Sequence, residues 1–448
     1  MVKIMEVLKK EYQNKKVLVV GLGIQGGGLG VARFFAQLGA KVKVTDLKNE
    51  TQLSESLDKL KLFPRISYTL GKHDIKDFLD ADVIFKGPSV RWDLPEMKAA
   101  QEHNIPVEME TSFFASLSPA SVIGITGTRG KSTTTQLIYE LLKETGRKVY
   151  LAGNIPGVST IELLNIVKPS DTVVLELSSW QLSGFHHKKV SPHIAIFTNI
   201  YPDHLNYYSS MDNYFYDKSA IFAYQKKEDI LIASPNLKSH IEEIVDSTPV
   251  QKIEYILPTY FPADLQYLKG IHNKENASLA LKTAEHLGIA KEKSIEIISQ
   301  FKGLPYRQEI IGEKEKVIFI NDTTSTTPIA TVRAIETFTD RPVVLILGGN
   351  AKGLPTDDLL HLLHNVSKII LLKGSFTNEI LSKLLSLYIS KVDTTIYSDL
   401  GSAVRKAYDD AKRIAPAYVL FSPGATSFAS FKNEFDRGDQ FNTIVASL

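Results

Sequence analysis

The chain of 448 residues contains no cysteine, which excludes disulfide bonds, thiolate metal sites and a cysteine nucleophile. It also has no run of 18 apolar residues, and its first residues have no apolar core of the signal-peptide type. Lys and Arg (52) nearly balance Asp and Glu (50), so neither a basic tail for nucleic acid nor a polybasic face for a membrane is present. We therefore expect a cytoplasmic protein without nucleic-acid or membrane partners.

Strand-like and helical segments alternate along the whole chain, which favours an α/β fold with parallel sheets. The length suits two or three domains. A new strand–loop–helix unit starts at residue 122, and Gly303 and Pro305 interrupt a later helical stretch. We predict domains over 1–112, 113–305 and 306–448. In the third, four apolar segments predict strands, within 316–322, 342–349, 368–374 and 417–424.

A glycine-rich loop follows a short apolar run near the start of the chain. Gly21, Gly23 and Gly26 form G-x-G-x-x-G, which lets backbone N–H groups approach a phosphate at a helix N-terminus. A strand is predicted over 17–20, a helix over 31–38 and a second strand over 42–45. Asp46 ends that second strand, where an acid can bond a ribose hydroxyl. The motif does not distinguish NAD, FAD and UDP, so an oxidoreductase and a nucleotide-free turn both stay open.

A second loop, "GITGTRGKSTTT", follows a predicted strand over 122–125 and precedes a predicted helix over 136–143. Its glycines expose N–H groups to phosphate, Lys131 reaches the β and γ phosphates, and Ser132 or Thr133 can ligate Mg²⁺. The loop is not a strict Walker A motif, because Ile125 stands where the first glycine belongs. An ATP loop in the middle of the chain argues against a simple dehydrogenase. The first loop is then better interpreted as holding the phosphates of a substrate.

A site for Mg²⁺ and ATP also needs side chains that place the metal. Glu176 follows the strand predicted over 173–175, at the carboxyl end where α/β sites lie. Asp203 and His204 come just beyond another strand end, at Asn199. Alone, a strand-end acid or a single histidine is as often structural as functional.

Five motifs then appear in one order: "GTRGKSTTT", "ELSSWQL", "HNKENA", "GLPYRQE" and "SPGATSFASFKNEFDRG". In these the chain resembles the Mur ligase family, whose members use ATP to add amino acids to the UDP-linked peptide precursor of the bacterial cell wall. The resemblance implies a Rossmann-like N-terminal domain, a P-loop central ATPase domain and a Rossmann-like C-terminal domain. It implies that a monomer adds D-glutamate to UDP-N-acetylmuramoyl-L-alanine through an acyl phosphate, in peptidoglycan synthesis.

The resemblance also implies roles for individual residues. The UDP substrate would contact Gly23, Ile24, Gln25, Asp46, Asn154, Ser178 and Gln181. ATP would contact Gly127, Thr128, Gly130, Lys131, Ser132, Thr133, Asn276, Arg307 and Asp322. Two Mg²⁺ ions would be held by Ser132, Glu176, His204 and a carbamylated Lys218, and the catalytic residues would be Lys131, Glu176, His204 and Lys218. The incoming glutamate would contact Thr326, Lys352 and Ser427.

Three positions depart from the family pattern, all near the third domain or its hinge. The third domain of the D-glutamate-adding members usually opens with N-D-S-K-A-T-N, but here it reads "NDTTSTTP", so Thr324 replaces the lysine. Tyr306 stands where histidine is usual, and Glu434 where an aromatic residue is usual. These changes leave L-glutamate open as the added amino acid. The alternatives to the implied roles are structural: Lys218 would be a solvated lysine on a helix, and Arg307 would only pair with Glu309.

Overall fold

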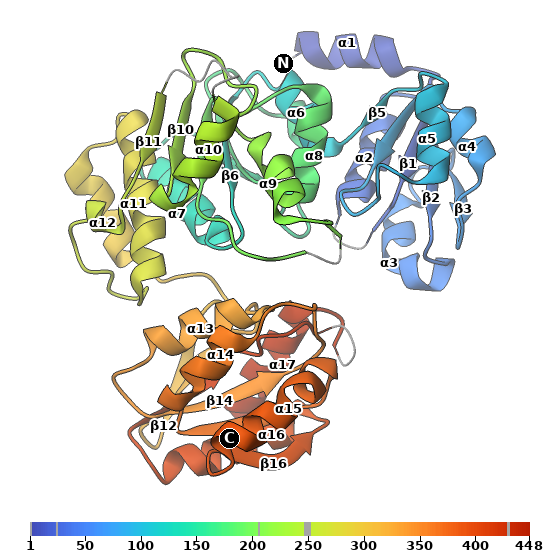
Figure 1. Ribbon diagram of the computed structural model, residues 1–448. Helices are drawn as coiled ribbons and strands as arrows, with labels where there is room; N and C mark the ends of the chain where they lie inside the picture. Colours follow the sequence, from blue (N-terminus) through green and yellow to red (C-terminus); the bar gives the residue numbers. More distant parts are fainter. Residues whose placement is uncertain (1, 24–25, 205–206, 246–251, 428–430) are drawn as a thin grey trace.

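The computed structural model describes residues 2–23, 26–204, 207–245, 252–427 and 431–448. Within these ranges the chain forms three α/β units, built on sheets of five, six and six strands (Figure 1). The predicted α/β class and the three units are confirmed. The predicted boundaries fall inside the helix Glu110–Leu117 and in the connection between Gln300 and Glu309, and they stay predictions. No helix among the described residues combines the length and the apolar character needed to cross a bilayer.

The N-terminal sheet has the order β3-β2-β1-β4-β5 and is parallel throughout. Its strands are β1 (Lys16–Val20), β2 (Lys41–Asp46), β3 (Ser67–Leu70), β4 (Val83–Lys86) and β5 (Val107–Glu108). Its helices are α1 (Val2–Tyr12), α2 (Gly27–Gln37), α3 (Glu50–Leu60), α4 (Ile75–Leu79), α5 (Pro95–Glu102) and α6 (Glu110–Leu117). The strand order reverses between β1 and β4, and ligands of open α/β sheets bind at such a point. The first glycine loop follows β1 directly.

Two helices after the glycine loops begin earlier than predicted. α2 begins at Gly27 rather than Val31. A Cβ at Gly28 would lie 2.2 Å from the carbonyl oxygen of Gly21, so only glycine permits the close approach of this helical turn to the end of β1. α7 (Lys131–Glu144) begins at Lys131 rather than Gln136. Gly130 has a left-handed conformation (φ 79°), so the second loop runs straight into the helix. Close backbone contacts override the low helix propensity of glycine and threonine.

The central sheet has the order β11-β10-β9-β6-β8-β7 and is also parallel. Its strands are β6 (Ser121–Thr126), β7 (Val149–Gly153), β8 (Thr172–Glu176), β9 (Ile194–Phe197), β10 (Ile230–Ala233) and β11 (Lys252–Tyr255). One face packs on α7, α11 (Ile271–His286) and α12 (Lys291–Gln300). The other packs on α8 (Ser179–Lys188), α9 (Met211–Ser219) and α10 (Lys238–Val245).

The C-terminal sheet has the order β12-β13-β17-β14-β15-β16, with β12 antiparallel to β13. The four predicted strands are β13 (Val317–Asn321), β14 (Val343–Gly348), β15 (Lys368–Leu372) and β17 (Ala417–Phe421). Two further strands, β12 (Glu309–Lys314) and β16 (Val392–Tyr397), form the two edges and were not predicted. One face carries α13 (Pro328–Thr337), α14 (Asp357–Leu362) and α15 (Ser375–Tyr388), and the other carries α16 (Leu400–Lys412) and α17 (Glu434–Ser447).

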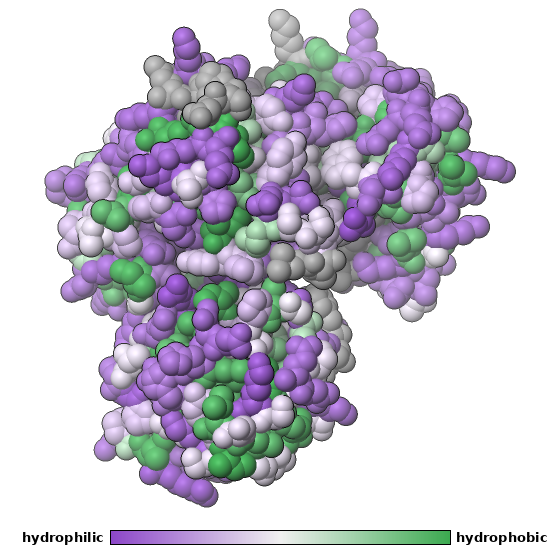
Figure 2. Space-filling view, in the orientation of Figure 1, coloured by the Kyte–Doolittle hydropathy of each residue, from purple (hydrophilic) through white to green (hydrophobic). Residues whose placement is uncertain are grey.

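The three units are joined in two different ways. One apolar cluster runs without a break from the N-terminal unit into the central unit, through Phe113 and Phe114 of α6 to Leu164 and Phe185. The C-terminal unit has apolar clusters of its own on each face of its sheet. The outline of the molecule narrows where this unit meets the rest (Figure 2). The N-terminal and central units therefore form one packed body, to which the C-terminal unit is attached separately.

Candidate active site

The second glycine loop packs closely between the end of β9 and α11. A Cβ at Gly127 (φ 144°) would lie 2.0 Å from Thr198 Oγ1, and one at Gly130 would lie 2.2 Å from Asn276 Oδ1. Neither position has room for a side chain. Thr128 Oγ1 accepts a hydrogen bond from the Tyr201 amide at 3.0 Å, which fixes the loop to the segment after β9. The loop therefore has a defined shape, with its N–H groups at the start of α7, where phosphate groups bind.

The half-buried Lys131 and the buried Lys218 meet at the same backbone carbonyl. Lys131 Nζ donates to the oxygens of Gly127 (2.9 Å) and Thr128 (3.1 Å). Lys218 Nζ, from α9, donates to Gly127 at 3.0 Å, and Lys218 is 1% exposed. Burial lowers the pKa of Lys131 to about 8, and burial together with the Lys131 charge lowers the pKa of Lys218 well below its usual value. The interpretation of Lys218 as a solvated helix lysine is therefore wrong.

Glu176 and His204 supply the donor atoms suited to a metal ion. Glu176 ends β8, is buried, and accepts one hydrogen bond from Asn154 Nδ2 at 3.0 Å. Burial and the neighbouring lysines lower the pKa of His204 to about 4, so its imidazole is neutral and has a free lone pair. In the described ranges no three His, Asp or Glu side chains gather closely enough to hold a metal. The Glu176 carboxylate is an oxygen donor of the kind that Mg²⁺ takes beside waters and phosphate oxygens, whereas an imidazole is a less usual ligand for this ion.

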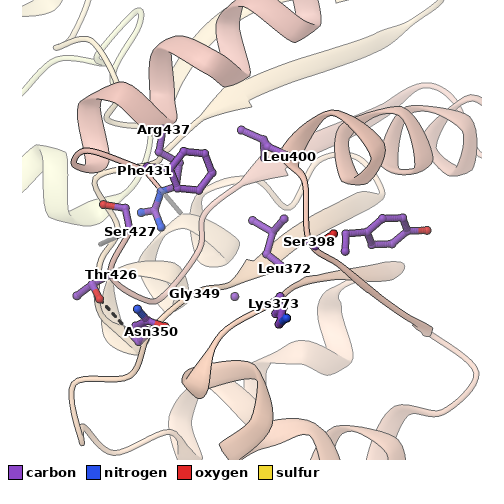
Figure 3. Close-up of a pocket in the computed structure, with 12 residues that line it drawn as sticks. Gly349, Asn350, Leu372, Lys373, Ser398, Leu400, Thr426, Ser427, Phe431 and Arg437 are labelled. Atoms are coloured by element: carbon purple, nitrogen blue, oxygen red, sulfur yellow. Dashed lines mark hydrogen bonds between the residues drawn. The ribbon is translucent and has the colours of Figure 1, made fainter. Parts of the chain in front are cut away.

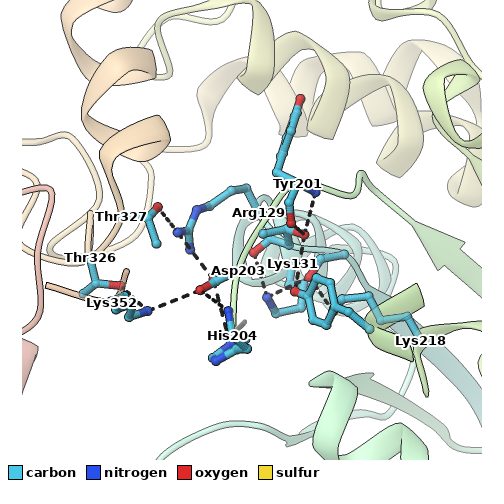
Figure 4. A network of polar contacts seen from close by, with 12 residues as sticks. Arg129, Lys131, Tyr201, Asp203, His204, Lys218, Thr326, Thr327 and Lys352 are labelled. Atoms are coloured by element: carbon cyan, nitrogen blue, oxygen red, sulfur yellow. Dashed lines mark hydrogen bonds and ion pairs between the residues drawn. The ribbon is translucent and has the colours of Figure 1, made fainter. Parts of the chain in front are cut away.

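Asp203 is the centre of a polar network that joins the central and C-terminal units (Figure 4). Lys352 Nζ lies 3.5 Å from Asp203 Oδ1 and 3.4 Å from Thr326 Oγ1. Arg129 Nη2 lies 3.6 Å from Asp203 Oδ2 and donates to Thr327 Oγ1. Burial alone would raise the pKa of Asp203, but Arg129 and Lys352 outweigh it and hold the pKa well below its usual range. Asp203 is therefore a charged, shared partner for cations from both units.

The hinge between α12 and β12 places Arg307 against the second loop. Arg307 Nη2 donates to Ser132 Oγ at 3.1 Å, so the alternative in which it only pairs with Glu309 is not what the structure shows. Tyr306 (φ 65°) and Gln308 (φ 52°) on either side have left-handed backbones, which are strained for such residues. Thr324 Oγ1 donates to the Tyr306 carbonyl at 2.9 Å. Two of the three departures from the family pattern thus contact each other and hold the hinge.

Asp322 and Asn276 support the loops around them. Asp322 Oδ2 accepts hydrogen bonds from Ser325 (2.6 Å) and Ser422 (2.7 Å), while Oδ1 accepts one from the Gln308 amide (3.1 Å). Burial raises the pKa of Asp322 to about 6. Asn276 is buried under the second loop. These contacts make both residues supports of the hinge and the loop. Ser132 and Thr133 lie half-buried in the first turn of α7.

The first glycine loop is shaped by the acid that was predicted to bind ribose. Asp46 Oδ2 accepts the Gly23 amide at 3.2 Å, and Oδ1 accepts the Lys48 amide at 2.9 Å. Ile24 and Gln25, which complete this predicted substrate contact, lie outside the described residues. A Cβ at Gly26 would lie 3.6 Å from Gly157, in the turn that follows Asn154. The loop therefore borders the central unit as well as its own sheet.

The turn after Asn154 is fixed by the first residue of α6. Glu110 Oε1 accepts hydrogen bonds from Ser159 Oγ (3.0 Å) and the Ile161 amide (3.1 Å). Burial of this carboxyl group raises its pKa to about 7. Ser178 and Gln181, also predicted to contact the substrate, form a reciprocal cap at the start of α8. The hydrogen bonds that these two side chains make with each other's backbone N–H groups stabilise the first turn of that helix.

The last predicted residue, Ser427, lines a pocket at the carboxyl ends of β14, β15 and β16 (Figure 3). Its Oγ is buried and has no hydrogen-bond partner among the described residues. Arg437 lines the same pocket and is 1% exposed. A bridge between Asn350 and Thr426 places this segment beside the loop that carries Lys352. All three guanidinium nitrogens of Arg437 donate hydrogen bonds, to Thr323 and to the Ala425 carbonyl, whereas the Ser427 hydroxyl, unpaired within the described ranges, is free for a polar group.

Sequence reasoning missed Arg129, which stands at a variable position of the loop motif. The residues around it belong to the motif, whereas nothing in the spacing indicates that the Arg129 side chain leaves the loop to reach Thr327. Asp203 was noted only as the neighbour of His204. Its role depends on cations that arrive from segments far apart in the sequence, so only the tertiary structure reveals it.

A P-loop unit lies between two further α/β units, and the joint between the central and C-terminal units brings cations close to the loop, an arrangement that suits an enzyme that uses a nucleotide. This joint consists of Arg129, Asp203, Thr326, Thr327 and Lys352. Residues 15–108 match the domain described as "Mur ligase MurD-like, N-terminal domain", and residues 125–259 match the "Mur ligase middle domain". UDP-N-acetylmuramoylalanine–D-glutamate ligase of Borreliella afzelii is 35% identical over 459 residues, which cover 98% of this chain and 99% of that protein. The enzyme of the same name from Roseiflexus sp. is 35% identical over 472 residues, covering 97% and 99%.

Among solved structures, UDP-N-acetylmuramate–alanine ligase MurC of Thermotoga maritima shares the fold, with a TM-score of 0.59 at 18% identity. The alignment covers 97% of this chain and all of that one. The chain belongs to the Mur ligase family. It is an ATP-dependent ligase that forms an amide bond, and the oxidoreductase interpretation of the first glycine loop is wrong.

Proposed function

We propose that the chain uses ATP to join D-glutamate to the alanine carboxylate of UDP-N-acetylmuramoyl-L-alanine, a step of peptidoglycan precursor synthesis. The observation that supports this most is the joint at Asp203, where Lys352 of the C-terminal unit contacts Asp203 and Thr327 accepts a hydrogen bond from Arg129 of the loop that also bears Lys131. An acid to be activated and an amino acid to be added must meet at such a place. The two relatives at 35% identity over nearly the whole chain are named for this reaction.

The chemistry follows from the charges that the site presents. An oxygen of the alanine carboxylate attacks the γ-phosphorus of ATP, ADP leaves, and an acyl phosphate remains. The glutamate amine attacks the acyl carbon, phosphate leaves, and the nitrogen loses a proton. Lys131 and the N-terminus of α7 neutralise charge on the transferred phosphoryl oxygens. Asn154 and the first glycine loop position the UDP substrate, while Thr326, Lys352 and Ser427 bind the amino acid.

We propose that Ser132, Glu176 and His204 hold Mg²⁺, which shields phosphate charge when bound, and that Lys218 becomes a carbamate. A neutral amine is the form that adds to CO₂, and burial of Lys218 against Gly127 favours the neutral form. A carbamate would supply the oxygen ligands for a second Mg²⁺ that the described acids do not provide. Asn276, Arg307 and Asp322 would border the nucleotide from α11 and the hinge.

The test is phosphate release from ATP with UDP-N-acetylmuramoyl-L-alanine and one of D-glutamate, L-glutamate, L-aspartate or L-lysine at equal concentration. D-Glutamate should react fastest. L-Glutamate is the second candidate, since Thr324 is engaged with Tyr306 and offers no positive charge to a carboxylate. A faster reaction with L-glutamate would overturn the stereochemical assignment, and activity only with L-lysine would overturn the choice of glutamate.

Thermal unfolding provides a control for the first glycine loop. A ligand at 100 times its dissociation constant stabilises a protein by roughly 2.7 kcal/mol, a readily visible shift. We expect such a shift with UDP-N-acetylmuramoyl-L-alanine and none with NAD. A shift with NAD alone would contradict the assignment of this loop to the UDP substrate.

A further inference from the structure

We propose that Arg129 is a specificity residue that binds a carboxylate of the incoming amino acid across the joint between the central and C-terminal units. This inference deepens the proposed function and rests on it. Arg129 belongs to the second glycine loop by its backbone, where its amide donates to Asn199 Oδ1 at 2.9 Å. Its side chain leaves the loop and crosses to the C-terminal unit. Figure 4 shows it extending toward Thr327, on the side of Lys352 and away from Lys218.

The guanidinium has donor capacity that the protein does not use. Nε is buried and has no hydrogen-bond partner in the part of the chain that the structure describes. One Nη2 hydrogen bond goes to Thr327 Oγ1, and the contact with Asp203 is loose, at 3.6 Å. A buried N–H without a partner has lost its hydration without gaining a protein acceptor, so an arginine held in this way can donate to a further acceptor. The fork of a guanidinium matches the two oxygens of a carboxylate.

The charges around Arg129 favour an anion. Asp203 is shared with Lys352, so one carboxylate faces two cations. Lys131 donates back into the loop at Gly127 and Thr128, where the phosphates of ATP would lie. Arg129 points instead to Thr327, the residue before α13, and Thr326 next to it contacts Lys352. The anion that fits between Arg129 and Lys352 is therefore on the amino-acid side of the joint.

Local departures from the family pattern agree with this placement. Thr324 occupies the position where a lysine is usual and donates to the Tyr306 carbonyl. The segment 323–327 therefore brings no cation of its own to the joint. Arg129 reaches the same segment, at Thr327, from the opposite unit. At Thr327 the positive charge is supplied by Arg129 of the second glycine loop, in addition to Lys352 of the C-terminal unit at Thr326.

The experiment compares the wild type with Arg129→Met and Arg129→Lys, using phosphate release at saturating ATP and UDP-N-acetylmuramoyl-L-alanine. The amino acids are D-glutamate and its two monoamides, D-glutamine and D-isoglutamine. In Arg129→Met we expect KM for D-glutamate to rise about tenfold or more, because a hydrogen bond to a charged group contributes about 1.5–3 kcal/mol. The preference for D-glutamate over at least one monoamide should fall by a similar factor, while KM for ATP changes less than about twofold. Arg129→Lys should recover part of the preference.

Arg405→Met is the matched control, since Arg405 is an exposed arginine of α16 and is not among the residues assigned to the joint, the loops or the pocket. Titration of D-glutamate into enzyme loaded with the UDP substrate and a non-hydrolysable ATP analogue gives a readout independent of turnover. Equal losses for all three amino acids, or a large rise in KM for ATP, would overturn the inference and leave Arg129 a structural or phosphate-binding residue. If the wild type uses no form of glutamate, the proposed function fails first, and this inference fails with it.

Discussion

At the scale of single residues, Lys131 should be the side chain on which turnover depends most. Its ammonium is held at the start of α7 by the Gly127 and Thr128 carbonyls. Lys131→Ala removes a charge aimed at the transferred phosphoryl group, so we expect phosphate release to fall roughly 10²-fold or more. Circular dichroism should show an unchanged fold. Near-normal turnover by a folded variant would show that Lys131 has no such role.

Lys218 offers a second prediction, with chemical rescue as its readout. Lys218→Ala should be strongly impaired, and added short carboxylic acids such as formate or acetate should restore part of the activity. The reason is that a carboxylate can replace a carbamate as a ligand for Mg²⁺. Lys218→Ala also empties a buried site, so melting must be compared with the wild type. Loss of activity without any rescue in a stable variant would argue against the carbamate.

Glu110 should make stability depend on pH. Burial raises its pKa in the folded protein from 4.5 to about 7, so the folded state keeps a proton that the unfolded state has released. The resulting stabilisation is complete below about pH 4.5 and is lost as the pH rises through about 7. Glu110→Gln imitates the protonated form. The unfolding free energy of Glu110→Gln minus that of the wild type, measured by denaturant titration, should be larger at pH 8 than at pH 5, by an amount on the order of 1–2 kcal/mol. The same difference at both pH values would contradict this.

At the scale of elements, the contact of α2 with the turn after Asn154 should be sensitive to one methyl group. A Cβ at Gly30 would lie 1.9 Å from Ser159 Oγ and 2.3 Å from Ser159 Cβ. Gly30→Ala should therefore destabilise the protein by about 1–3 kcal/mol and weaken binding of the UDP substrate, because α2 must move. Thermal unfolding and KM measure the two effects.

Second-site variants of Ser159 distinguish this clash from a change in helix propensity, which would favour alanine. Ser159→Gly removes both atoms that Gly30→Ala would meet and should recover much of the loss. Ser159→Ala retains Cβ and should recover little. Equal recovery by the two would mean that the clash is not the cause.

The elements and residues that sequence could predict share a simple physical basis. Strands such as β1, β6, β14 and β17 are continuous apolar runs because they are buried on both faces. β12 and β16 were missed because these edge strands are mostly exposed or half-buried, carry several polar residues and contain no continuous apolar run. Lys131 and Glu176 follow from local motifs, whereas Arg129 and Asp203 acquire their partners only across the joint. The starts of α2 and α7 depend on close backbone contacts that no local pattern encodes.

At the scale of the whole molecule, the separate cores should unfold separately. The N-terminal and central units share one apolar cluster, while the C-terminal unit has its own. We expect calorimetry of the full chain to show two transitions, the smaller one belonging to the C-terminal unit. Adding the UDP substrate with a non-hydrolysable ATP analogue should raise the midpoint temperatures of both transitions and reduce the difference between them. A single transition with equal calorimetric and van't Hoff enthalpies would contradict independent cores.

The attachment of the C-terminal unit through Asp203 has a consequence for inhibition. A small molecule bound between Asp203 and Lys352 would hold the central and C-terminal units apart. ATP and the UDP substrate would stay bound, but the amine of the amino acid could not reach the acyl carbon. Such a compound resembles neither nucleotide and would not be displaced by raising the concentration of either. Its selectivity would come from the cations that this chain places at the joint, Arg129 above all, rather than from a phosphate loop shared with many other enzymes.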